Sequence, residues 1–101
     1  LARARQIFTD LCYATHRLHM AGICHLDIKL ENVLLDTKNQ RVVLADFGFS
    51  QPSDLRQTAY NGSLHYAAPE VVGNKPFVGS AADVWSLGVV LYSMITEAFP
   101  V

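Results

Sequence analysis

The chain has 101 residues, half of them hydrophobic and 17% charged, which is a globular composition and excludes a disordered chain. Its formal net charge of −1 gives no sign of a nucleic-acid surface or of an anionic membrane as partner. Cys12 and Cys24 fit no metal-binding spacing, so we expect reduced thiols, with the cytoplasm or the nucleus as the default location.

The first half of the chain predicts a helix, a polar loop and a β-hairpin. Apolar residues recur with a period near 3.6 over residues 2–21, which predicts a helix. Gly22 is the expected stop, because glycine tolerates the left-handed conformation that ends helices. Residues 23–32 carry a cluster of polar side chains and predict an irregular loop. Two short apolar runs, 33–35 and 42–44, flank a polar turn and predict a hairpin.

The second half predicts a long loop followed by two helices. Residues 49–66 show no hydrophobic period, so we expect a functional loop, since structureless stretches of this length are otherwise uncommon. Pro69 predicts the first turn of a short helix over residues 70–72. Ser80 is the predicted N-cap of the last helix, and Asp83 would complete a variant of the capping box.

The last helix is expected to follow a loop over residues 73–79 and to run to about Glu97. It is apolar on nearly every side, as a central buried helix should be. Its apolar stretch, residues 84–95, is shorter than the roughly 20 residues that span a bilayer, so no membrane segment is predicted.

Four residues in two polar motifs point to phosphoryl transfer. The polar loop, residues 25–32, contains Asp27, Lys29 and Asn32, and Asp46-Phe47-Gly48 follows. Asp27 would accept or orient the proton of an attacking hydroxyl, and Lys29 would place positive charge on the transferring phosphate. Asn32 and Asp46 offer oxygen ligands to Mg²⁺, which needs few protein ligands. The alternatives are turn chemistry and an ordinary surface lysine, and the fixed offsets favour the functional interpretation.

With a third motif, residues 68–70 (Ala-Pro-Glu), the chain resembles a eukaryotic protein kinase domain of the serine/threonine type. Residues 83–88 extend the resemblance to the last helix. The sequence of residues 62–70 looks most like that of the calmodulin-dependent and AMP-activated kinase-like group. The resemblance implies an α+β fold, the mostly helical C-terminal lobe of the protein-kinase-like fold with a short β-hairpin. Residues 1–101 would form an incomplete domain without the N-terminal lobe and the last helices.

The resemblance implies roles for individual residues. Asp27 and Lys29 would be catalytic, and Asn32 and Asp46 would hold Mg²⁺. Leu34 would form the floor of the adenine pocket, although the sequence by itself predicts only a strand residue in the core. The residues implied to bind ATP are Lys29, Glu31, Asn32, Leu34 and Asp46.

Further residues are implied to support the site. Ser63 would bond the catalytic aspartate and lysine, and Leu64 would help form the pocket for the residue after the phosphorylated one. Asp83 would anchor the polar loop through backbone hydrogen bonds. His25 would stack beneath Phe47 as a structural residue and not as the general base, despite the pKa range typical of histidine. Phe47 itself is expected to pack in the core.

Two positions concern regulation and stability. Leu26 stands where the family usually has an arginine that clamps a phosphate on the activation loop, so we expect activity that does not depend on this clamp. Thr58 is a candidate phosphosite, with an ordinary loop threonine as an equal alternative. Glu70 is implied to pair with an arginine outside the chain, and a buried unpaired carboxylate would cost about 3–5 kcal/mol. We therefore expect the isolated segment to be poorly stable and inactive.

Three functions compete. The first is a parent enzyme that transfers the ATP γ-phosphoryl group to protein Ser/Thr hydroxyls, with ATP and Mg²⁺, and without nucleic-acid or membrane partners. The second is a pseudokinase, a binding or scaffold module on the same fold. The retained Asp27, Lys29, Asn32 and Asp46 favour the enzyme. A small independent helical interaction protein is disfavoured, because both ends would break off within the domain.

Overall fold

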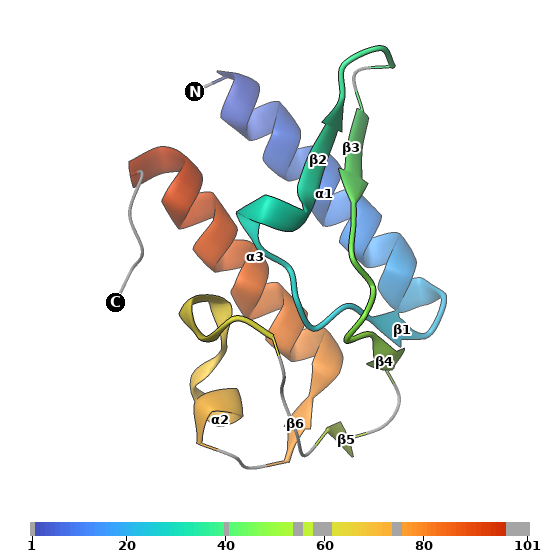
Figure 1. The fold of residues 1–101 in the computed structure, drawn as a ribbon, viewed down its shortest axis with the longest axis vertical. Helices are drawn as coiled ribbons and strands as arrows, with labels where there is room; N and C mark the ends of the chain where they lie inside the picture. The colour runs from blue at the N-terminus through green and yellow to red at the C-terminus, as the bar shows by residue number, and fades with distance from the viewer. Residues whose placement is uncertain (1, 40, 54–55, 58–61, 74–75, 97–101) are drawn as a thin grey trace.

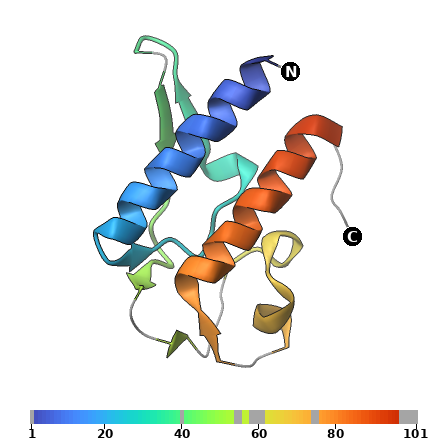
Figure 2. The ribbon, with the colours of Figure 1, turned by 180° about the vertical axis from the view of Figure 1, so that it is seen from behind.

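The computed structural model describes residues 2–39, 41–53, 56–57, 62–73 and 76–96. Two long helices, α1 (Ala2–Met20) and α3 (Gly79–Thr96), cross the molecule side by side, and the hairpin of β2 (Val33–Asp36) and β3 (Arg41–Leu44) packs against α1 (Figures 1 and 2). The predicted helix, hairpin and final helix are confirmed. Gly22 ends α1 with a φ of 84°, as expected of a left-handed stop.

The shorter elements lie between these three units. The chain order is β1 (Ile23–Cys24), the 3₁₀ turn η1 (Leu30–Asn32), β2, β3, β4 (Gln51–Pro52), β5 (Arg56–Gln57), the 3₁₀ turn η2 (Leu64–Tyr66), α2 (Pro69–Val72) and β6 (Phe77–Val78). All three strand pairs are antiparallel: β2 with β3 in the register Val33 to Leu44, β1 with β4, and β5 with β6. The expectation of no regular structure in residues 49–66 was therefore wrong at β4, β5 and η2. The strands β4 and β5 pair with strands that are distant in sequence, whereas η2 is a turn with local hydrogen bonds.

The core lies between the two long helices. Leu11 of α1 and Val90 of α3 are fully buried, and Ile28 of the polar loop is buried in the same cluster. Apolar packing against the two helices therefore stabilises the position of the loop. A second apolar cluster joins the polar loop to α2, β6 and the start of α3. Its buried members are Cys24, Leu26, Ala68, Val71, Phe77 and Ala82.

The start of α3 corrects the predicted cap. The helix begins at Gly79, so Ser80 lies inside its first turn and is not the N-cap, and the Asp83 carboxylate bonds the polar loop instead. A Cβ at Gly79 would overlap the Sγ atom of Cys24, so only glycine allows β1 and α3 to approach this closely.

The outer face of α3 is apolar and exposed, although the helix is apolar on nearly every side and was expected to be central. Val84, Trp85 and Ile95 are exposed there, while the opposite face is buried. None of the described helices combines the length and the apolar character needed to cross a membrane.

Candidate functional site

One buried carboxylate of α3, that of Asp83, anchors the polar loop through hydrogen bonds. Asp83 is 1% exposed, its Oδ2 accepts a hydrogen bond from the backbone N–H of His25 at 2.8 Å, and its Oδ1 accepts one from Leu26 at 2.9 Å. The anchoring role expected of Asp83 is confirmed. Leu26 has a positive φ of 68°, a conformation that side chains rarely adopt. Its strain is sustained because the anchored N–H groups and the buried side chain both require this geometry.

The sequence did not point to His19, which completes the anchor. His19 Nε2 donates to Asp83 Oδ2 at 2.8 Å, so one carboxylate oxygen serves both the last turn of α1 and the polar loop. The only signal in the sequence was a histidine in the last turn of a predicted helix. The contact depends on how α1 packs on α3, which the local pattern does not encode.

A histidine that links α1 to the carboxylate holding the loop should affect the local stability of that loop. In the complete protein that contains this chain, His19→Ala is expected to speed the hydrogen exchange of the backbone amides of residues 25–26 by about tenfold, because the Asp83 carboxylate loses a charge-assisted hydrogen bond. His19→Gln, whose amide N–H can still donate, should recover most of the lost protection. Equal losses in both variants would contradict a role through this hydrogen bond.

His25 is structural, as expected. Its Nδ1 accepts the backbone N–H of Asp27 at 3.0 Å, so Nε2 carries the proton that is donated to the carbonyl of Ala45 at 2.8 Å. The ring meets Phe47 edge-on, with centroids 4.9 Å apart. Both ring nitrogens are therefore engaged, and His25 is not placed to act as a base. Phe47 is 47% exposed, so its predicted place in the core was wrong.

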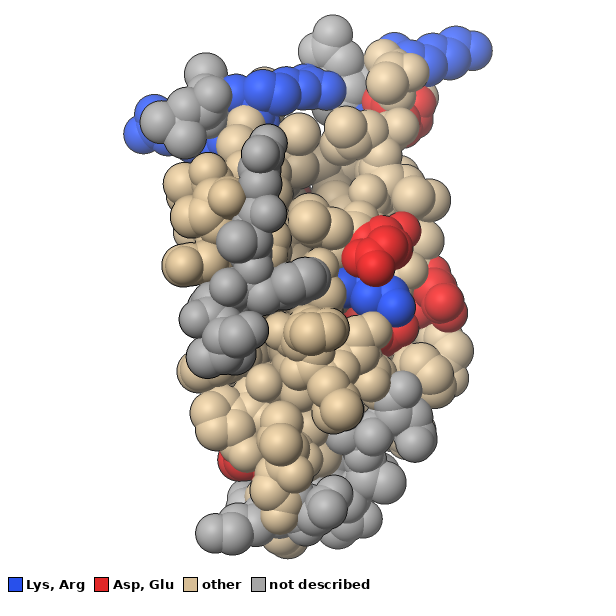
Figure 3. Space-filling view, turned by 60° about the vertical axis from the view of Figure 1, so that its left-hand side comes forward, with Lys and Arg blue, Asp and Glu red and all other residues tan. Residues whose placement is uncertain are grey.

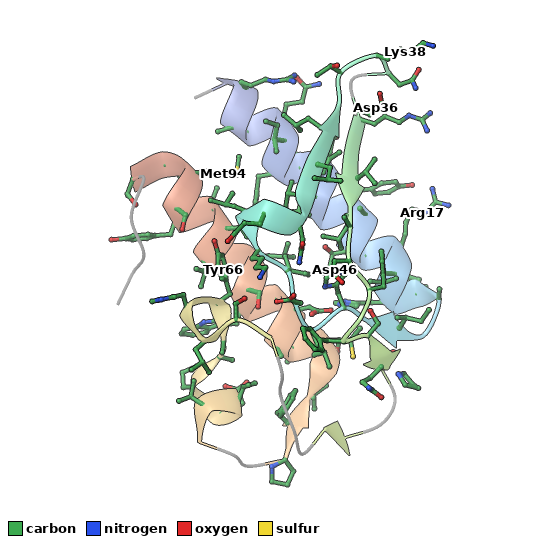
Figure 4. All side chains as sticks on the ribbon, in the orientation of Figure 1. Arg17, Asp36, Lys38, Asp46, Tyr66 and Met94 are labelled. Carbon is green, nitrogen blue, oxygen red and sulfur yellow. The ribbon has the colours of Figure 1, made fainter. Side chains whose placement is uncertain are left out.

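Ala45 brings the two polar motifs together. Its carbonyl accepts from His25, and its N–H donates to the carbonyl of Asn32 at 2.8 Å. Asp46 follows directly, so the segment after β3 is fixed against the polar loop on both sides. Figure 4 shows Asp46 near the middle of the molecule, where this segment passes the loop.

Asp27 is the centre of a hydrogen-bonded network. It is 4% exposed, and its Oδ1 accepts from the Ser63 backbone N–H at 3.3 Å and from the Ser63 hydroxyl at 3.4 Å. Lys29 Nζ lies 3.9 Å from Asp27 Oδ2 and donates to Ser63 Oγ at 2.9 Å. The expected bonds of Ser63 to the aspartate and the lysine are confirmed. The network fixes a carboxylate and an ammonium group side by side, as a proton acceptor and a phosphate counter-charge require.

Asn32 and Asp46 offer oxygen donors of the kind that Mg²⁺ prefers. The Nδ2 group of Asn32 donates to the carbonyl of Asp27 at 2.8 Å, which turns its amide oxygen to the opposite side. Asp46 is exposed, has a φ of 58°, and accepts the Gly48 N–H at 3.2 Å through Oδ1. Within the described ranges, no three His, Cys, Asp or Glu side chains gather into a complete metal cage. Mg²⁺ needs no such cage, since waters and phosphates complete its octahedron.

Burial keeps the nearby thiol inert. Burial and, to a smaller extent, the charge of Asp83 raise the pKa of Cys24. The thiol therefore keeps its proton, which it donates to the Gln51 carbonyl at 3.3 Å. The prediction of a structural reduced cysteine agrees with this environment.

Several predicted residues lie on the surface. Leu34 is 49% exposed and Leu64 is 70% exposed, so the prediction of a core position for Leu34 was wrong. Glu31 is also exposed. Glu70 is exposed rather than buried, so the predicted cost of a buried unpaired carboxylate does not apply here. Thr58 lies outside the described residues.

Comparison with known proteins gives a consistent result. The family model described as "Protein kinase domain" matches residues 1–101. "Mitosis inducer protein kinase cdr1" of Schizosaccharomyces pombe is 41% identical over 99 residues, which cover 96% of this chain and 17% of that protein. "Probable serine/threonine-protein kinase HSL1" of Saccharomyces cerevisiae is 47% identical over 99 residues, covering 95% of this chain and 6% of that protein. "NUAK family SNF1-like kinase 2" of Rattus norvegicus is 44% identical over 100 residues, covering 96% and 16%. The chain thus spans only a small part of each of these relatives.

Proposed function

The chain belongs to the protein kinase family, and from that premise we propose that the complete protein transfers the γ-phosphoryl group of ATP to Ser and Thr hydroxyls of proteins. The observation that carries the proposal is the network of Asp27, Lys29 and Ser63 beside Asn32 and Asp46. ATP is the phosphoryl donor of the family, which typically uses Mg²⁺.

The proposed chemistry assigns each group a task. The Asp27 carboxylate orients the attacking hydroxyl and accepts its proton, and the Ser63 contacts keep this carboxylate in place. Lys29 neutralises charge on the transferring phosphoryl group. Asn32 and Asp46 would hold Mg²⁺, which supplies charge neutralisation at the phosphates when it is bound. We assign Glu31 and Leu34 to the ATP side of the site and Leu64 to the substrate side, which agrees with their exposure.

We further propose that residues 1–101 are part of the C-terminal lobe of a kinase domain. The two long helices, the single hairpin and the anchored polar loop support this placement. The pseudokinase is disfavoured, because Asp27, Lys29 and Asn32 are joined in one hydrogen-bonded network, and Asp46 is fixed beside it. A scaffold module has no need of this arrangement.

The direct test is phosphate incorporation into a Ser/Thr peptide by the complete protein. Asp46→Asn is expected to lower kcat by about 10³-fold, because the charged metal ligand is lost. Asp36→Asn, a carboxylate change in the hairpin turn, is the matched control and should leave kcat unchanged. Activity equally low in the unaltered protein and in Asp46→Asn would support the pseudokinase instead.

Leu26 stands in place of the arginine that would bind an activation-loop phosphate, so we expect the activity of the complete protein not to depend on such a phosphate. Its side chain is 5% exposed and packs in the apolar cluster with Ala68, Val71 and Phe77, which ties the polar loop to α2 and β6 without any charge. Thr58→Ala and Thr58→Glu are therefore both expected to leave kcat within about twofold, since no arginine is present at this position to bind a phosphate. A strong rise with Thr58→Glu and a strong fall with Thr58→Ala would show that a clamp exists elsewhere.

A further inference from the structure

An open groove lies between α1 and the β2–β3 hairpin, and it shares no residue with the proposed active site. It encloses about 590 Å³, and its walls include Tyr13, Ala14 and Arg17 from α1 and Asn39, Arg41 and Val42 from the hairpin. A smaller hollow that also contains Arg41 and Val42 continues it to Arg3. Together, the two hollows follow one face of α1 over about four helical turns, of which the larger groove takes about three.

Its surface combines apolar and cationic groups. Tyr13 is 63% exposed, and the guanidinium of Arg17 lies 5.9 Å from the centre of its ring. Ala14 and Val42 add apolar surface between the two walls. Aromatic and arginine side chains at a concave surface are the groups that most often carry binding energy at protein interfaces.

The two elements that form the walls carry an excess of positive charge in a chain whose net charge is −1. Between them, α1 and the hairpin hold five basic and two acidic residues. Arg3, Arg17, Arg41 and Asp10 line the groove and its extension, whereas Arg5, Lys38 and Asp36 lie outside both linings. Figure 3 shows basic side chains on both sides of the upper end of the molecule, with an acidic side chain beside one of them, and a basic side chain among acidic ones lower down. Basic groups are thus most frequent at the upper end in this view.

One of these two acids is already engaged. Asp36 accepts hydrogen bonds from the Asn39 side chain and from the backbone N–H groups of Lys38 and Asn39, so its carboxylate belongs to the turn. The hydrogen bonds from Asn39 are the main reason why the pKa of Asp36 is lowered. Arg17 and Arg41 then face the groove with Asp10 as the single acid in its wall.

We propose that this groove docks an acidic linear segment of a protein substrate. Carboxylates of the segment would pair with Arg17 and Arg41, and one apolar side chain between them would rest against Tyr13 and Val42. The distance along α1 from Gln6 to Arg17 is roughly 16 Å, which fits about five residues of extended peptide. Asp10 interrupts the positive wall, which favours a peptide over the continuous phosphate backbone of a nucleic acid.

The inference rests on the proposed kinase function for its role in substrate selection, while the docking itself is measurable without turnover. The probe is a fluorescein-labelled peptide of sequence Glu-Glu-Leu-Glu-Glu, and its binding to the complete protein is followed by fluorescence polarisation. The double variant Arg17→Glu/Arg41→Glu is expected to weaken binding at least about tenfold. The matched control is Arg5→Glu/Lys38→Glu, which changes the net charge equally outside the groove wall and should alter binding less than about twofold.

A kinetic measurement connects docking to catalysis. The same double variant should raise KM for a Ser/Thr substrate peptide that carries the acidic segment, and leave kcat and KM unchanged for one without it. Equal weakening of probe binding by both double variants would overturn the proposal, as would tighter binding of a single-stranded oligonucleotide than of the peptide at the same salt. Probe binding retained in Asp46→Asn, with turnover lost, would support docking independently of catalysis. A protein that binds the probe but never transfers phosphate would refute the proposed function and leave the docking site in place.

Discussion

Replacing Asp27 with Asn in the complete protein is expected to lower kcat by about 10³-fold while the KM for ATP changes little. General base catalysis typically contributes 10²–10⁴-fold, and an amide cannot accept the hydroxyl proton. The change is isosteric, and the neighbouring Ser63 can still hydrogen-bond the remaining oxygen, so the fold should be unaffected. The measurement is steady-state phosphate transfer to a Ser/Thr peptide, with ATP binding followed separately.

Ser63→Ala tests the positioning of the Asp27 carboxylate separately from its role as a base. It removes the hydroxyl that contacts both Lys29 and Asp27, and the base itself remains. We expect a loss of about tenfold in kcat, since the carboxylate keeps its contact with the Ser63 backbone N–H. A variant Asp27→Asn that retains more than a tenth of the original kcat would remove Asp27 from the role of base.

The second large effect concerns the anchor of the polar loop. Asp83→Ala leaves the N–H groups of His25 and Leu26 buried without their acceptor and frees His19 from its partner. The expected cost is about 3–5 kcal/mol, as for other broken buried charge contacts. Hydrogen exchange of the complete protein should show the backbone amides of residues 25–26 exchanging about 10²–10³ times faster, and turnover should fall because the loop carries Asp27 and Lys29.

Asp36→Asn is the matched control for this effect. It also removes one carboxylate charge, but the Asp36 carboxylate bonds only residues of the hairpin turn, so amide protection at residues 25–26 should stay unchanged. Unchanged amide protection at residues 25–26 in Asp83→Ala would show that the loop is held mainly by the burial of Ile28 and Leu26. Loss of that protection in Asp36→Asn as well would show that the effect does not arise from the Asp83 anchor.

Local pattern was sufficient for the largest elements. The 3.6-residue period, the glycine stop at Gly22 and the polar turn between two apolar runs predicted α1 and the hairpin, because these signals act within a few residues. Resemblance to the motifs of a known family, and not periodicity, proposed Asp27, Lys29, Asn32 and Asp46 for the site. The same resemblance predicted the anchoring by Asp83 and the bonds of Ser63.

Only the tertiary structure decided which side of each element is covered. Leu34 and Phe47 were expected to be buried and are exposed, because burial depends on what packs against a residue and not on its own hydrophobicity. Glu70, whose burial was implied by the family resemblance, is also exposed. Asp83 has a sequence position that suits a helix cap, and its carboxylate instead bonds N–H groups more than 50 residues away. The groove beside Arg17 and Arg41 likewise exists only because α1 packs beside a hairpin that follows it in the chain. Sequence by itself determined the local conformation and supplied the motifs of the proposed site, whereas packing between distant segments determined the anchors, the exposed faces and the groove.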